Sequence, residues 1–127
     1  MKLIGSKMES DFREELIRSN EALQARDSKL RMALESEGHD YINSYVLHYV
    51  PEQLEDLYTV LVGGTYVVDV EIDKYDGSKS PTVQRHELKP YLHGLSKMNQ
   101  VRLAVAQDLA CSKHNKQRQH RPAGWMR

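Results

Sequence analysis

The chain has 127 residues, of which 39% are hydrophobic, and its formal net charge is zero. This length suits one domain with a modest core and excludes a second folded domain. No apolar run approaches the roughly 20 residues of a membrane-spanning helix, and the N-terminus lacks the apolar core of a secretory signal, so we expect a cytoplasmic protein with no membrane partner.

The charges are divided unevenly along the chain. Residues 1–56 hold 12 acids and 7 bases, whereas residues 91–127 hold 1 acid and 7 bases. An anionic partner would therefore meet the C-terminal end, and two copies could pair head to tail as a homodimer. The single cysteine, Cys111, excludes an intramolecular disulfide and agrees with a reducing compartment.

The first predicted element is one long amphipathic helix between Ser6 and Gly38. Ser6 and Glu9 have the spacing of a capping box, and Gly38 is a natural C-terminal stop. At 1.5 Å per residue such a helix would be about 45 Å long, which is more than a small domain can cover. We therefore expect that part of the helix meets a partner or that the helix breaks.

The apolar stripe of this helix has two interpretations. Leu16, Leu23 and Leu30 lie one heptad apart, as in a dimerising coiled coil, but Asn20 and Asp27 occupy the complementary positions. We favour a helix that packs on the protein's own sheet and keep the coiled coil as the alternative. An exposed stripe would be the partner-binding surface, and its residues are Phe12, Leu16, Leu23 and Leu30.

From Tyr41 onward the pattern predicts an antiparallel meander of three to four strands. β-branched and aromatic residues concentrate in three segments, which are residues 42–50, 57–62 and 65–73. Gly63 and Gly64 predict a two-residue hairpin turn. Residues 51–62 could alternatively form a helix with proline in its first turn, which would leave three strands; we favour the strand.

The third of these segments has one apolar and one mostly acidic face. Val68 and Val70 alternate with Asp69 and Glu71, and the acidic face should be wet. Pro81 then opens a polar segment that could pair as an edge strand.

Ser96 is the predicted N-cap of a final helix that presents a broad apolar surface to the sheet. After it, the chain has five Lys or Arg residues and no acid, so residues 113–127 should form a flexible basic tail. The predicted fold class is therefore α+β, with a long N-terminal helix, the meander sheet and a C-terminal helix packed on it. Residues 1–112 form the single domain.

One pattern points to a metal-dependent nuclease. Such a core needs an Asp at the end of one strand and Glu-x-Lys on its neighbour, because two carboxylates bind the ion while the lysine orients water. Asp69 or Asp73, followed by Glu87 and Lys89, has that layout. Residues 69–89 thus resemble the PD-(D/E)xK nucleases, and the resemblance implies Mg²⁺-dependent cleavage. The polar surroundings of Glu87 favour a solvated hairpin instead.

We expect no metal site and no cofactor. Cys111, His114 and His120 have the spacing C-x2-H-x5-H, but three zinc ligands without a fourth do not make a structural site. No glycine-rich phosphate loop is present, because Gly63 and Gly64 belong to a hairpin.

The basic tail could bind DNA or RNA. Its cations can neutralise phosphates and its tryptophan could stack on a base; these residues are Lys113, Lys116, Arg118, Arg121, Trp125 and Arg127. The alternative is a solvated extension, or one that binds the acidic half of a second copy.

Because no convergent catalytic set is recognisable, the sequence favours a small non-enzymatic binding or regulatory protein, of the inhibitor, immunity or adaptor type. Such a protein would act through protein–protein contacts. A nucleic-acid-associated protein and a Mg²⁺-dependent nuclease are the two alternatives.

Overall fold

The computed structural model describes residues 2–119, with side chains as far as residue 112. Within that range the chain forms four helices and four strands. In chain order they are α1 (Lys7–Leu23), α2 (Lys29–Ser36), β1 (Ser44–Pro51), β2 (Glu55–Val62), β3 (Tyr66–Asp73), β4 (Thr82–Glu87), α3 (Leu88–Leu92) and α4 (Lys97–Gln119).

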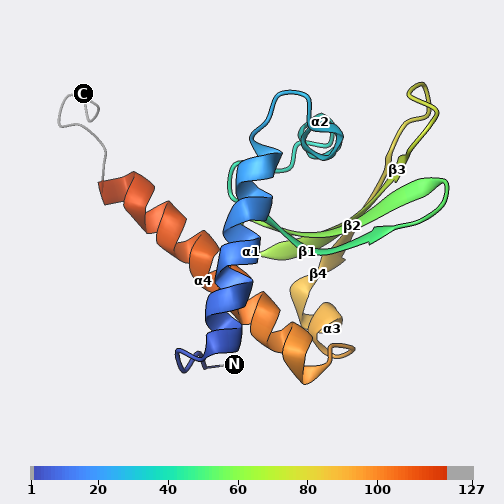
Figure 1. Ribbon diagram of the computed structural model, residues 1–127. Coiled ribbons are helices and arrows are strands. Elements are labelled where there is room, and N and C mark those ends of the chain that lie inside the picture. Colours follow the sequence, from blue (N-terminus) through green and yellow to red (C-terminus); the bar gives the residue numbers. More distant parts are fainter. Residues whose placement is uncertain (1, 120–127) are drawn as a thin grey trace.

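The four strands form one antiparallel sheet in the order β1-β2-β3-β4. This confirms the predicted α+β meander, the strand interpretation of β2 and the edge position of β4. Helices α1 and α4 cross over one face of the sheet, and α2 lies against the other (Figure 1). We call these the α1/α4 face and the α2 face.

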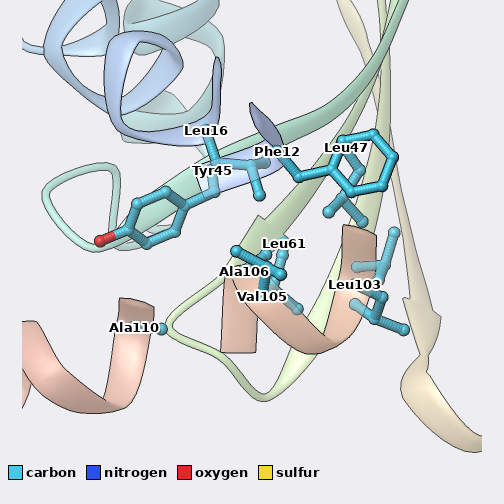
Figure 2. Packing of buried hydrophobic residues seen from close by; sticks show 10 residues of the cluster. Phe12, Leu16, Tyr45, Leu47, Leu61, Leu103, Val105, Ala106 and Ala110 are labelled. Carbon is cyan, nitrogen blue, oxygen red and sulfur yellow. The ribbon is translucent and has the colours of Figure 1, made fainter. Parts of the chain in front are cut away.

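A first core lies between the α1/α4 face and its two helices. Tyr45, Leu61 and Val67 are partners on three adjacent strands, so their side chains form one row on this face. Figure 2 shows this row's Tyr45 and Leu61 with neighbours from both helices; the buried cluster comprises Phe12, Leu16, Tyr45, Leu47, Leu61, Val67, Leu103, Val105, Ala106 and Ala110. Each large side chain buried here stabilises the fold by about 1.5–3 kcal/mol.

A second core lies between the α2 face and α2. Its strand residues are the alternate positions of β2 and β3, because successive side chains of a strand point to opposite faces. The buried members are Leu23, Leu30, Ala33, Leu34, Val60, Val62, Val68, Val70 and Ile72. Near the Gly63 turn the two central strands are therefore apolar on both faces.

The single long N-terminal helix expected from the sequence is broken into α1 and α2. Helix α1 ends at Leu23, and Ser28 caps α2 by accepting a hydrogen bond from the backbone N–H of Arg31, at 3.1 Å. The break lets α2 turn to the opposite face, where Leu30 and Leu34 are buried. Breaking the helix was one of the two outcomes that its excessive length predicted.

The predicted partner-binding stripe is not exposed. All four of its side chains are buried in the protein's own cores, and they are Phe12, Leu16, Leu23 and Leu30. This corrects their assignment to a partner surface and supports the alternative in which the helix packs on its own sheet. The reason is that the sheet offers apolar faces on both sides, so the stripe covers both of them.

The predicted capping box at Ser6 and Glu9 is confirmed. Ser6 Oγ accepts from the Glu9 backbone N–H at 3.2 Å, and the Glu9 carboxylate accepts from the backbone N–H groups of Ile4 and Gly5. Burial by itself would raise the pKa of Glu9, but these donors together with the Ser6 hydroxyl outweigh it and lower the pKa.

Helix α4 begins where the sequence predicted, since Ser96 Oγ accepts from the Asn99 backbone N–H at 3.2 Å. The helix continues to Gln119, past the predicted boundary at residue 112, and its far end extends beyond the sheet (Figure 1). Residues 120–127 lie outside the described residues, so a flexible tail there stays a prediction. Within residues 2–119, no helix has the length and apolar character to cross a bilayer.

The turn between β2 and β3 contains three residues, Gly63 to Thr65, rather than the predicted two, because Val62 pairs with Tyr66. Both glycines have positive φ angles, +60° and +76°. A Cβ atom built on Gly64 would lie 3.1 Å from the Cβ of Ala110 in α4. This glycine therefore allows both the tight turn and the close approach of the helix.

Replacing Gly64 with alanine should destabilise the protein more than the same change at Gly38. Both glycines have left-handed φ angles, +76° and +77°, so both variants pay about 1–2 kcal/mol for a Cβ in that conformation. Only Gly64→Ala also strains the contact with Ala110, because nothing lies within 4 Å of the Gly38 position. Urea unfolding of the two variants measures the difference, and equal losses would contradict this role of the close approach.

Candidate binding surfaces

Part of the α1/α4 face carries polar side chains next to the core. The row after the core contains His48, Thr59, Asp69 and Gln84, which are partners on the four strands. Thr59 Oγ1 donates to Asp69 Oδ1 at 3.0 Å, and His86 Nε2 lies 2.7 Å from Asp69 Oδ2.

The order of these contacts does not match a nucleophilic triad. In that arrangement an imidazole stands between the hydroxyl and the carboxylate and takes the hydroxyl proton. Here the Asp69 carboxylate stands between Thr59 and His86, so the hydroxyl has no imidazole base. Tyr91 lies nearby, and burial followed by the charge of Asp69 raises its pKa, which keeps the phenol protonated.

A pocket of about 360 Å³ adjoins His48 at the β1 side of the same face. Arg102 of α4 lines it, donating to Glu15 at 3.0 Å and lying 4.3 Å from the ring centre of Phe12. The Arg102 guanidinium is therefore already paired and stacked. Burial, and then the charge of Arg102, lowers the pKa of His48 below its ordinary value of 6.5.

The nuclease candidates do not converge. Asp69 pairs with Gln84 and belongs to the α1/α4 face, whereas Glu87 pairs with Tyr66, whose row belongs to the α2 face. Lys89 lies in α3 rather than in a strand. The carboxylates that would share a metal ion thus point to opposite sides of the sheet.

Asp73, the other carboxylate candidate, closes a turn. Its Oδ1 accepts from the backbone N–H groups of Asp76 and Tyr75 at 2.7 and 2.9 Å, and these bonds lower its pKa. Among the described residues, no group of three or more His, Cys, Asp or Glu side chains could hold a metal ion. The side chains of His114 and His120 lie outside the described residues, so this finding does not cover the C-x2-H-x5-H pattern that they form with Cys111.

A groove of about 570 Å³ runs between α2 and the β3–β4 hairpin. Its apolar floor includes Ala33 and Ile72, and Lys29, Lys79 and Asp73 stand along it. Lys79 Nζ lies 3.9 Å from Asp73 Oδ2, so part of the charge is balanced within the groove.

Four large apolar side chains are exposed at the end of the sheet that contains the β1–β2 and β3–β4 turns. We call this end the sheet tip, and its residues are Tyr49, Val50, Leu54 and Tyr75. The exposed fractions of these side chains are 51%, 50%, 62% and 78%. They lie where the β1–β2 and β3–β4 turns end the sheet, away from the helices α1 and α4 (Figure 1). The backbone N–H of Lys74 donates to the Leu54 carbonyl at 2.9 Å and joins the two turns.

The sheet tip has an acidic border. Residues 49–56 and 71–79 contain six acids and two bases. Tyr49 is held in place, since its ring stacks on Tyr58 with centroids 4.9 Å apart and its hydroxyl donates to Asp56 at 2.9 Å. Sequence reasoning missed this surface because Tyr49 and Val50 have the same strand-forming character as buried residues.

The predicted nucleic-acid-binding residues are only partly placed. The backbone of Lys113, Lys116 and Arg118 belongs to α4, while Arg121, Trp125 and Arg127 lie outside the described residues. A role for these residues stays a prediction.

Comparisons with known proteins find no matching family model, no matching curated protein and no matching solved structure.

The lowered pKa of His48 makes stability depend on pH. Because the folded protein binds the His48 proton less readily than the unfolded chain, the free energy of unfolding should fall as the pH drops below 6.5. His48→Gln should weaken this fall, while His93→Gln, at an exposed histidine, serves as the matched control. Chemical unfolding between about pH 5 and 7.5 measures it. A pH dependence unchanged by His48→Gln would contradict the assignment.

Proposed function

We propose that this is a small non-enzymatic binding protein, of the inhibitor, immunity or adaptor type, that acts through protein–protein contacts at the sheet tip. The observation that carries the proposal is that four large apolar side chains at one end of the sheet are each half exposed or more. Tyr49 and Val50 are consecutive in β1, so this exposed apolar surface includes both faces of the sheet. Exposed apolar groups that cluster on a soluble protein typically mark interaction sites.

The composition of the sheet tip suits a protein partner. Tyrosine is enriched among the residues that dominate binding energy, and the tip contains Tyr49 and Tyr75. Stacking and the Asp56 hydrogen bond hold Tyr49 before binding, which lowers the entropy cost of association. The acidic border favours a partner whose own apolar site is bordered by basic residues.

The double variant Leu54→Ser, Tyr75→Ser should weaken binding of a stoichiometric protein partner at least about tenfold, because two apolar anchors are removed. Both side chains are mostly exposed, so the fold should be retained. The matched control is Ile42→Ser, Met98→Ser, at side chains 46% and 53% exposed away from the tip. Partner capture by tagged protein followed by calorimetric titration gives the affinities.

Equal affinity of the tip variant and the wild type would contradict the proposal. So would an equal loss in the control variant, since that would indicate general destabilisation or another surface. Circular dichroism of each variant checks that the fold is intact.

A second candidate function, nucleic-acid binding, is favoured by the length of α4. The helix continues to Gln119 and extends beyond the sheet (Figure 1). The basic residues from position 113 onward therefore begin within a helical segment that projects beyond the sheet. A protein of this kind would bind phosphates through counterion release.

Removal of residues 113–127 should then abolish binding to mixed DNA and RNA, and binding by the full chain should fall steeply between low and moderate salt. Binding that survives the truncation would exclude the tail mechanism. With Mg²⁺ present the same assay detects cleavage, and we expect none because Asp69 and Glu87 lie on opposite faces. Cleavage lost in Glu87→Ala and Lys89→Ala would instead support the nuclease interpretation.

A further inference from the structure

The two edges of the sheet differ in how their backbone groups are satisfied. At the β1 edge, α1 supplies hydrogen bonds: Ser19 Oγ accepts from the Val46 backbone N–H at 3.0 Å, and Asn20 Nδ2 donates to the Ser44 carbonyl at 2.9 Å. The strand also carries a bulge after Val46 and ends at Pro51, which has no N–H. These features close the β1 edge to another strand.

The register identifies which backbone groups point outward from β4. Ser44 and Val46 direct their groups to α1, so Tyr45 between them bonds to Leu61 of β2. Alternation then continues across the antiparallel sheet, and the residues of β4 that bond to β3 are Thr82, Gln84 and His86. The groups of Val83, Arg85 and Glu87 therefore point away from the sheet.

Two of these three residues offer a complete donor and acceptor pair. Glu87 is the N-cap of α3, so its carbonyl already accepts the first bond of that helix. Val83 and Arg85 keep both N–H and C=O on the outer side. Among the hydrogen bonds found within residues 2–119, none reaches these outward groups from another element.

We infer that two copies of the protein associate through β4, which pairs antiparallel with β4 of a second copy and places Gln84 opposite Gln84. In this register Val83 of each copy exchanges two backbone hydrogen bonds with Arg85 of the other. Thr82 of each copy lies opposite His86 of the other. The two sheets then form one continuous sheet about a two-fold axis.

The charges of β4 favour a second copy as the occupant. With Gln84 at the axis, no two like charges lie directly opposite, whereas an axis at Arg85 would oppose two guanidinium groups. An axis at His86 would need the carbonyl of Glu87, which α3 already uses. The charge of Arg85 is balanced within its own chain, because its Nε lies 3.2 Å from Glu87 Oε1. The strand is thus complementary to itself.

This association is independent of the proposed partner surface. The β3–β4 turn precedes β4, and antiparallel pairing places the turns of the two copies at opposite ends of the shared sheet. A dimer would therefore present two sheet tips, one at each end of the shared sheet.

Disulfide cross-linking tests the register directly. Residues at a non-hydrogen-bonded antiparallel pair have Cα atoms about 4.5 Å apart, which a disulfide can bridge. In a Cys111→Ser background, Gln84→Cys should cross-link rapidly to a second copy when a thiol oxidant such as diamide is added. Thr82→Cys, at an equally exposed position, is the control, because two copies of residue 82 lie about 13 Å apart along the strand.

A second pair of variants tests the backbone hydrogen bonds. Arg85→Pro removes an outward N–H without touching the bonds to β3, and Arg85→Thr loses the same guanidinium but keeps the N–H. Sedimentation equilibrium should give a dimer dissociation constant at least about tenfold weaker for Arg85→Pro than for Arg85→Thr.

A wild-type protein that remains monomeric at all concentrations would overturn the inference, as would equal dissociation constants for the two Arg85 variants. Cross-linking of Gln84→Cys no faster than that of Thr82→Cys would also overturn it. A protein that is monomeric on its own and pairs β4 only with a strand of another protein would likewise overturn the inference.

Discussion

The central strands β2 and β3 are apolar on both faces near the Gly63 turn, and this constraint governs the arrangement of the helices. Val60 and Val68 are buried on one face, while Leu61 and Val67 are buried on the other. A sheet with two apolar faces must be covered on both sides, because exposing either would forfeit about 25 cal/mol per Å² of apolar surface. One N-terminal helix lies on only one side, so the other face requires a second helix.

The break between α1 and α2 allows α2 to cover the second face of the sheet. The Asn20 amide donates to the carbonyls of Ile42 and Ser44, which fixes α1 to the β1 edge just before the helix ends. Arg31 of α2 donates to the Gln24 carbonyl at 2.7 Å and to the Tyr41 hydroxyl at 2.8 Å, which ties the second helix to the connection around it. These polar contacts set the chain path, and burial of α2's leucines supplies the driving force.

Sequence reasoning predicted the elements whose signals are local. The capping box at Ser6, the hairpin turn at Gly63 and the N-cap at Ser96 each involve residues within a few positions of one another. All three are found, with a turn of three residues instead of the predicted two. Sequence reasoning predicted a possible break from the length of the helix but did not locate it at residues 24–28, because no proline or glycine lies there and the apolar spacing continues through it. The break depends on the second face of the sheet, a long-range feature that periodicity does not contain.

The candidate surfaces could be predicted even less well, for a related reason. Tyr49 and Val50 lie in the same strand as Tyr45, have the same strand-forming character, and become exposed only because the sheet extends beyond its helices. Apolar side chains at that end add little to the stability of the fold. Polar residues could form the same strand pairs without removing any residue from the two cores. Leu54 and Tyr75, in turns where polar residues are usual, bury no core surface either. The apolar character of these side chains is therefore not explained by the stability of the fold.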